Sequence, residues 1–70
     1  MQYLVVIEQG SNSFGAYVPD LPGCVAAAES RAEVASLIQE AIALHIEDLR
    51  ARGQHVPQPH SVGELVCVDA

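Results

Sequence analysis

The chain of 70 residues has room for one small domain, residues 1–70, with a marginal core, because short chains bury a small share of their surface. Nine acidic residues against three arginines and no lysine leave a net charge of −6. This charge disfavours direct binding to nucleic acid; it suits a basic partner, or simply keeps the chain soluble. No apolar run is long enough to span a membrane and no basic leader opens the chain, so we expect a cytoplasmic protein.

Three short strands are predicted in the first part of the chain. Residues 3–8 are rich in β-branched side chains and apolar on both faces, which predicts a strand in the centre of a sheet. A polar turn over residues 9–13 separates it from a second strand at 14–18, so these two strands form a hairpin. A third strand is predicted at 23–29, where three alanines fill little volume.

A rigid turn joins the second and third predicted strands. Pro19 and Pro22 fix their own φ angles and push the residues before them toward extended geometry. Gly23 supplies the freedom that a tight reversal needs, and Asp20 can bond to backbone groups nearby. Such a turn either only joins two strands or presents a preorganised edge to a partner, where rigidity lowers the entropic cost of binding.

One long helix is predicted after the third strand. Ser30 and Glu33 form a capping box, and the helix extends from there to about Arg52. A stripe of residues at helical spacing, apolar except for His45, is expected to pack on the sheet: Val34, Ile38, Ala41, His45 and Leu49. Three glutamates recur every seven residues and are expected to face away from it: Glu33, Glu40 and Glu47.

A loop at residues 54–61 and a final strand at 64–68 complete the predicted order β-β-β-α-β. The fold class is α+β, a small antiparallel-rich sheet with one helix packed on one face. The other face has nothing in the chain to cover it and is a candidate dimer surface. Half of the residues are apolar, more than a small monomer needs to bury, so we expect a homo-oligomer, a dimer or a tetramer.

The stretch Tyr17-Val18-Pro19-Asp20-Leu21-Pro22-Gly23-Cys24 resembles the signature of HicB-type antitoxins, the inhibitor halves of small bacterial toxin–antitoxin pairs. The likeness covers roughly residues 2–60 and includes three further stretches: 29–33, 40–47 and 53–59. It implies a partial ribonuclease H-like fold. It also implies a small basic HicA-type partner, a toxin that cleaves mRNA with a catalytic histidine that the antitoxin covers. Many members carry a C-terminal DNA-binding domain; none follows the last predicted strand, so operator binding is not expected here.

The side chains predict no catalytic, cofactor or metal site. The carboxylates of Glu8, Asp20 and Glu64 are scattered along the chain, whereas a magnesium-dependent nuclease needs several that converge. Cys24 and Cys67 lie in apolar strands and are expected to be reduced core thiols, and no cysteine or histidine pair has zinc-ligand spacing. We therefore expect a protein that is not an enzyme.

Two functional hypotheses follow. In the first, the chain is a non-enzymatic antitoxin that binds and masks a HicA-type toxin, with four acidic residues as the partner-binding set: Asp20, Glu33, Glu40 and Glu47. In the alternative, it is an orphan homo-oligomeric HicB-like binding domain with an unknown ligand or protein partner. A neighbouring reading frame for a small basic protein would favour the first hypothesis, and its absence would favour the second.

Overall fold

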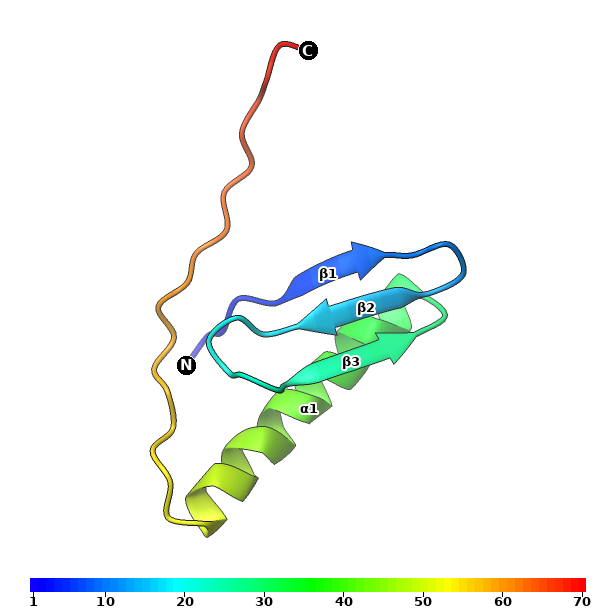
Figure 1. Ribbon diagram of the computed structural model, residues 1–70. Coiled ribbons are helices and arrows are strands. Elements are labelled where there is room, and N and C mark those ends of the chain that lie inside the picture. The colour runs from blue at the N-terminus through cyan, green and yellow to red at the C-terminus, as the bar shows by residue number, and fades with distance from the viewer.

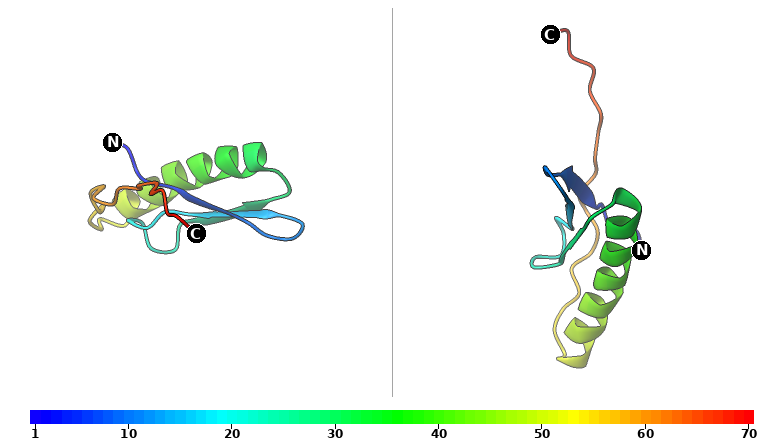
Figure 2. Two further views of the ribbon diagram at one scale, coloured as in Figure 1. Left: turned by 90° about the horizontal axis from the view of Figure 1, so that it is seen from above. Right: turned by 90° about the vertical axis from the view of Figure 1, so that its right-hand side faces the viewer.

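The computed structural model describes residues 1–70 and has one sheet and one helix. Strands β1 (Val6–Gln9), β2 (Phe14–Tyr17) and β3 (Val25–Ala28) are antiparallel and lie in the order β1-β2-β3. Helix α1 (Arg31–Ala51) covers one face of this sheet and leaves the other bare (Figures 1 and 2). The predicted α+β class, with a single helix on one face, is confirmed.

The register of the sheet decides which side chains enter the core. Ala16 of β2 lies between Ile7 of β1 and Ala26 of β3. Because successive residues of a strand point to opposite faces, these three side chains share one face of the sheet. This is the face on which α1 packs Val34 and Ile38, both buried. The small alanines on β2 and β3 leave room for the helix to lie close to the sheet.

The helix begins and ends on local signals. Ser30 has extended backbone geometry, and its hydroxyl accepts a hydrogen bond from the Glu33 amide at 3.1 Å, which confirms the predicted N-cap. After the last helical residue, Ala51, Gly53 adopts a left-handed φ of 69°. A glycine there lets the chain reverse without steric strain, so the helix stops where the sequence predicts.

The position of β1 differs from the prediction. Residues 3–8 are apolar on both faces, which favours a central strand, yet β1 lies at an edge of the sheet and β2 lies in its middle. The paired part of β1 is also shorter and begins at Val6, because its partner Tyr17 is the last residue of β2 before the proline turn. No strand of the same chain pairs with the outer edge of β1.

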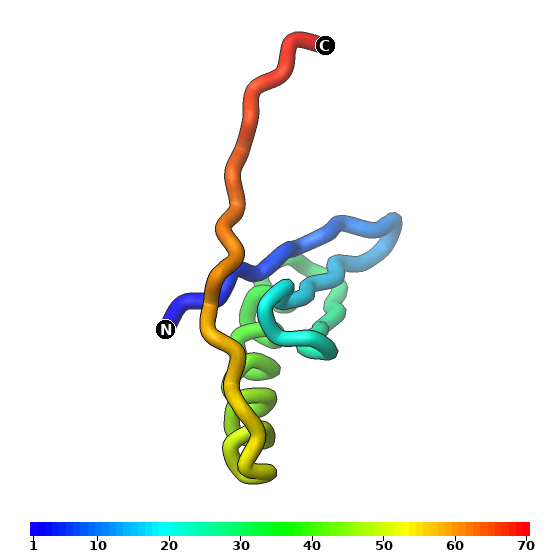
Figure 3. The backbone as a smooth tube through the Cα atoms, turned by 60° about the vertical axis from the view of Figure 1, so that its left-hand side comes forward, coloured from blue at the N-terminus to red at the C-terminus, as the bar shows by residue number.

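The predicted fourth strand is not part of the sheet, so that part of the prediction is wrong. Residues 54–70 form no helix or strand. They run back past the start of the chain and then away from the body, which stretches the molecule to 48 Å along its longest axis (Figure 3). The apolar pattern of residues 64–68 marks a segment able to form a strand, but a strand also needs a neighbour to pair with.

The two cysteines differ in their surroundings. Cys24 is buried in the core, and burial raises the pKa of its thiol, so it stays protonated and unreactive. Cys67 is exposed on the segment that leaves the body, so its predicted place in the core is wrong. Both are free thiols.

Candidate interaction surfaces

The turn between β2 and β3 is held by its own backbone. The amide of Val18 donates to the carbonyl of Cys24 at 3.2 Å, and the amide of Cys24 donates to that of Leu21 at 3.1 Å. Gly23 adopts a φ of 85°, which only a residue without a Cβ takes easily. The Leu21 side chain points inward and is only 1% exposed. The turn is therefore a packed part of the core as well as a connection between strands.

Asp20, at the tip of this turn, binds a segment forty residues later in the chain. Its carboxylate accepts hydrogen bonds from the backbone amides of His60 and Ser61, at 2.8 Å and 2.9 Å, and from the Ser61 hydroxyl at 2.6 Å. The His60 ring nitrogen Nε2 lies 3.1 Å from the same carboxylate, although the His60 side chain itself is mostly exposed. Asp20 thus fastens the chain beyond the helix to the sheet.

These contacts fix the charge of Asp20 and occupy its oxygens. The Ser61 hydroxyl, followed by the amides of Ser61 and His60, lowers the pKa of Asp20 to about 2, because each hydrogen bond favours the ionised carboxylate. The residue is only 4% exposed, and its bonds are made to groups of its own chain. Its contribution to partner binding stays a prediction, and the burial means that it can act only through the shape of the turn.

The three predicted glutamates lie together on one exposed face of α1. Leu37 and Leu44 fall between them in sequence, so that Glu33, Leu37, Glu40, Leu44 and Glu47 follow one another at alternating spacings of four and three. Residues at this spacing share one side of a helix. Leu37 is 39% exposed and Leu44 is 65% exposed. We call these five residues the acid–leucine face.

The structure does not bring all four predicted site residues together. Asp20 is buried between the turn and the loop after α1, whereas the acid–leucine face lies on the side of α1 that is turned from the core. Sequence reasoning included neither Leu37 nor Leu44 in the predicted partner-binding set. The signal that could have identified them is the spacing: the two leucines, like the three glutamates, lie seven residues apart, so they recur on one side of the helix.

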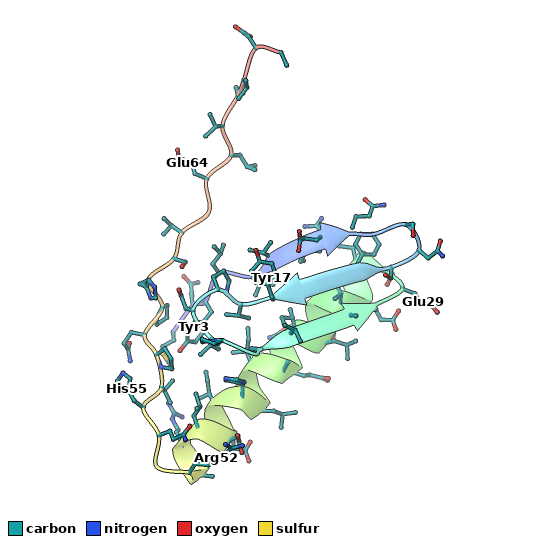
Figure 4. All side chains as sticks on the ribbon, viewed as in Figure 1. Tyr3, Tyr17, Glu29, Arg52, His55 and Glu64 are labelled. Atoms are coloured by element: carbon teal, nitrogen blue, oxygen red, sulfur yellow. The ribbon has the colours of Figure 1, made fainter.

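The bare face of the sheet carries a second apolar group. Val6, Tyr17 and Val25 lie side by side across the three strands, on the opposite face from the row that meets α1. Tyr17 and Val25 are exposed, and Tyr17 projects from the strand surface that the helix leaves uncovered (Figure 4). This row is the only aromatic-bearing part of that face, and it suits an apolar contact with another chain.

The remaining polar residues make no cluster with evident chemistry. No three histidine, cysteine or carboxylate side chains lie close enough together to hold a metal ion. Arg52 pairs with Asp48 at 2.9 Å along the exposed helix surface, a contact worth only a few tenths of a kcal/mol. Helix α1 is not both long and apolar enough to cross a bilayer.

Two curated relatives are similar to this chain. One is described as an uncharacterized 14.9 kDa protein in the rep–hol intergenic region of Haemophilus phage HP1; it is 29% identical over 66 residues, or 94% of this chain and 50% of the relative. The other is a UPF0150 protein of Helicobacter pylori, 46% identical over 46 residues, or 66% of this chain and 64% of the relative. The chain therefore spans about half to two thirds of the length of these relatives.

A solved structure shows the same fold. A chain in a structure described as "HicA3 and HicB3 toxin-antitoxin complex" matches with a TM-score of 0.73 at 33% identity, over 84% of this chain and 70% of that one. The family described as "HicB_like antitoxin of bacterial toxin-antitoxin system" matches residues 3–69, nearly the whole sequence. The resemblance carried by the proline turn is confirmed, and the chain belongs to the HicB-like antitoxin family.

Proposed function

We propose that this chain is an antitoxin, a non-enzymatic protein that binds and masks a small, basic, mRNA-cleaving toxin of the HicA type. The observation that carries the proposal is the match, in sequence and in fold, to a chain of a solved toxin–antitoxin complex. Because the target of such a toxin is mRNA, the proposed place of action is the bacterial cytoplasm.

The acid–leucine face is the proposed contact with the toxin. Three glutamates on one side of α1 are complementary in charge to cations on a basic partner. They also raise the rate of association, because opposite charges steer two proteins together. Leu37 and Leu44 add the apolar centre that a stable interface needs, since charge alone gives rate and specificity more than affinity. A face that combines both kinds of residue suits a toxin whose RNA-binding surface is basic.

The proline turn is the second proposed contact. Its backbone is fixed by hydrogen bonds, Leu21 anchors it in the core, and Asp20 ties it to the chain after the helix. A surface held in this way loses little conformational entropy on binding. The role of Asp20 in this proposal is to hold the shape of the turn, because its own oxygens are already occupied.

A charge reversal on the helix tests the acid–leucine face. The double substitution Glu40→Lys and Glu47→Lys should slow association with the toxin by about tenfold or more and flatten the dependence of that rate on salt, because it removes steering charges. Stopped-flow mixing with a purified HicA-type toxin, over a range of salt concentrations, measures both effects. RNA cleavage by the toxin in the presence of each variant reports inhibition.

The matched control is the double substitution Glu29→Lys and Asp69→Lys, which alters the net charge equally at two exposed positions outside α1 and outside β1. An equal loss in both variants would mean that net charge matters and the helix face does not. Unchanged kinetics in the helix variant would remove the acid–leucine face from the interface.

The alternative is an orphan homo-oligomer that binds something other than a toxin, and the bare apolar row of Val6, Tyr17 and Val25 favours self-association. Self-association into a dimer or tetramer is compatible with both functions. Purification of the tagged chain from its native host, followed by light scattering of the eluate, separates them. A small basic companion whose RNA cleavage stops on adding this chain supports the antitoxin; a homo-oligomer without a companion supports the orphan.

A further inference from the structure

The last eight residues form an arm with an unusual surface. The chain is held at Ser61 by Asp20, and Gly63 still lies against Leu4, whose Cδ1 would be 3.2 Å from a Cβ added at Gly63. Beyond this point the arm, residues 63–70, leaves the body (Figures 1 and 3). Leu65 is 102% exposed and its neighbours are exposed as well. Four consecutive apolar residues, 65–68, are exposed to water, which indicates that another surface covers them.

The composition of the arm is that of a β-strand. Residues 65–68 are Leu, Val, Cys and Val, without glycine, proline or charge, and Glu64 and Asp69 bound them on either side. Their backbone amides and carbonyls have no partner within the chain, as in an edge strand open to pairing. The arm therefore offers both a row of hydrogen-bonding groups and apolar side chains.

The body of the molecule offers the complementary surface. The outer edge of β1 is unpaired, and beside it a groove of about 310 Å³ opens between β1 and α1. Gln39 and six apolar residues line it, the apolar ones divided equally between the first strand region and the helix: Tyr3, Val5, Ile7, Ala35, Ile38 and Ile42. One further strand along β1 would continue the sheet, and every second side chain of that strand would enter the groove.

The arm does not fill this groove in its own chain. It is fastened twice before it leaves the body: the Tyr3 hydroxyl donates to the carbonyl of Pro57, and Asp20 holds His60 and Ser61. From there it diverges from β1 and does not run along it (Figure 1). Each chain thus has an arm able to form a strand but no edge to pair with, and a β1 edge with no strand beside it. A second copy satisfies both at once, and the exchange closes as a two-fold dimer.

We propose that two copies of this chain exchange arms, so that residues 64–68 of each pair with β1 of the other and place alternate side chains in the groove beside α1. The groove has no charged residue in its lining, and residues 65–68 are uncharged. Two acidic chains can therefore make this contact without bringing like charges together. A basic toxin is the less suitable occupant, because the lining of the groove has no acidic residue to pair with its cations. The exchange leaves the acid–leucine face free.

A proline scan of the arm tests the pairing. Proline has no backbone N–H, and in a strand only every second N–H points to the neighbouring strand. Substitutions Leu65→Pro, Val66→Pro, Cys67→Pro and Val68→Pro should therefore raise the dimer dissociation constant in alternation, by about tenfold more at one pair of alternate positions than at the other. Sedimentation equilibrium measures this constant for each variant, and Asp69→Pro, beyond the paired residues, is the control.

Isotope-filtered NMR on a mixture of labelled and unlabelled chains shows which copy the arm contacts. We expect contacts between the arm methyls of one chain and Val5, Ile7 and Ile42 of the other. Contacts only within one chain would overturn the exchange in favour of an arm that folds back. A monomer with unprotected arm amides, or a dimer that every proline variant leaves intact, would overturn it too. Toxin inhibition is measured separately, so its loss or retention does not bear on this result.

Discussion

Alanine substitution of two leucines that differ in burial tests whether the proline turn is packed in the core. Leu21, in the proline turn, is 1% exposed and belongs to the six-residue core cluster. Replacement of such a residue by alanine removes buried methyl groups and leaves a cavity, which costs about 2–5 kcal/mol. A domain of this length has a total stability of roughly 4–10 kcal/mol, at about 0.05–0.15 kcal/mol per residue. Leu21→Ala should therefore remove a large share of it.

The same chemical change at Leu44 is the control. Leu44 is 65% exposed on the acid–leucine face, so Leu44→Ala should change the free energy of unfolding by less than about 0.5 kcal/mol. Urea unfolding followed by circular dichroism gives both values. All variants are compared at one protein concentration, because self-association adds to apparent stability. In thermal unfolding, a loss of about 3 kcal/mol in Leu21→Ala corresponds to a midpoint lower by roughly 12–24 °C.

The stabilities of Leu21→Ala and Leu44→Ala test two separate statements about burial. A loss below about 1 kcal/mol in Leu21→Ala would show that the turn is not packed in the core. A large loss of stability in Leu44→Ala would show that this leucine is buried in the molecule, contrary to its exposed place on α1. If Leu44→Ala is stable but binds the toxin less tightly, the apolar part of the acid–leucine face is supported.

Two further predictions concern Asp20 and Ser30. Because hydrogen bonds lower the folded-state pKa of Asp20 from an ordinary 3.8 to about 2, its ionised form stabilises the fold in full above pH 3.8 and loses this effect as the pH falls through about 2. The stability difference between the parent and Asp20→Asn, followed by urea unfolding from about pH 5 to about pH 2, should therefore shrink over this window; a constant difference would contradict the assignment. Ser30→Ala should cost about 1 kcal/mol in unfolding free energy because it removes the N-cap of α1, and Ser30→Asp should restore most of it; equal stability of all three chains would rule out the cap.

The local structure of this protein follows from the sequence because neighbouring residues determine it. Ser30 caps the helix three residues from the amide that it binds, and Gly53 ends the helix by a conformation that it adopts easily. The two prolines and Gly23 define a turn whose pattern also identifies the family. Each of these predictions depends on a few consecutive residues, so no knowledge of the rest of the chain was needed.

The candidate site was only partly predictable. The heptad spacing of Glu33, Glu40 and Glu47 is a helical property, and the structure leaves all three exposed on one side of α1. Asp20 was predicted to contact a partner, yet it is buried, because His60 and Ser61, forty residues later in the sequence, bind its carboxylate. Nothing in the turn itself predicts that the loop after the helix comes back to it.

By itself, the sequence determined the helix, the hairpin, the turn and the family, since these depend on local backbone preferences and on the spacing of apolar residues. Only the tertiary structure decided which edges and segments stay unpaired. The apolar pattern of residues 64–68 predicts a strand, but whether that strand finds a neighbour depends on where Asp20 fastens the chain and on the direction in which it leaves. Strand pairing is an interaction between distant segments, so its energy cannot be predicted from either segment alone.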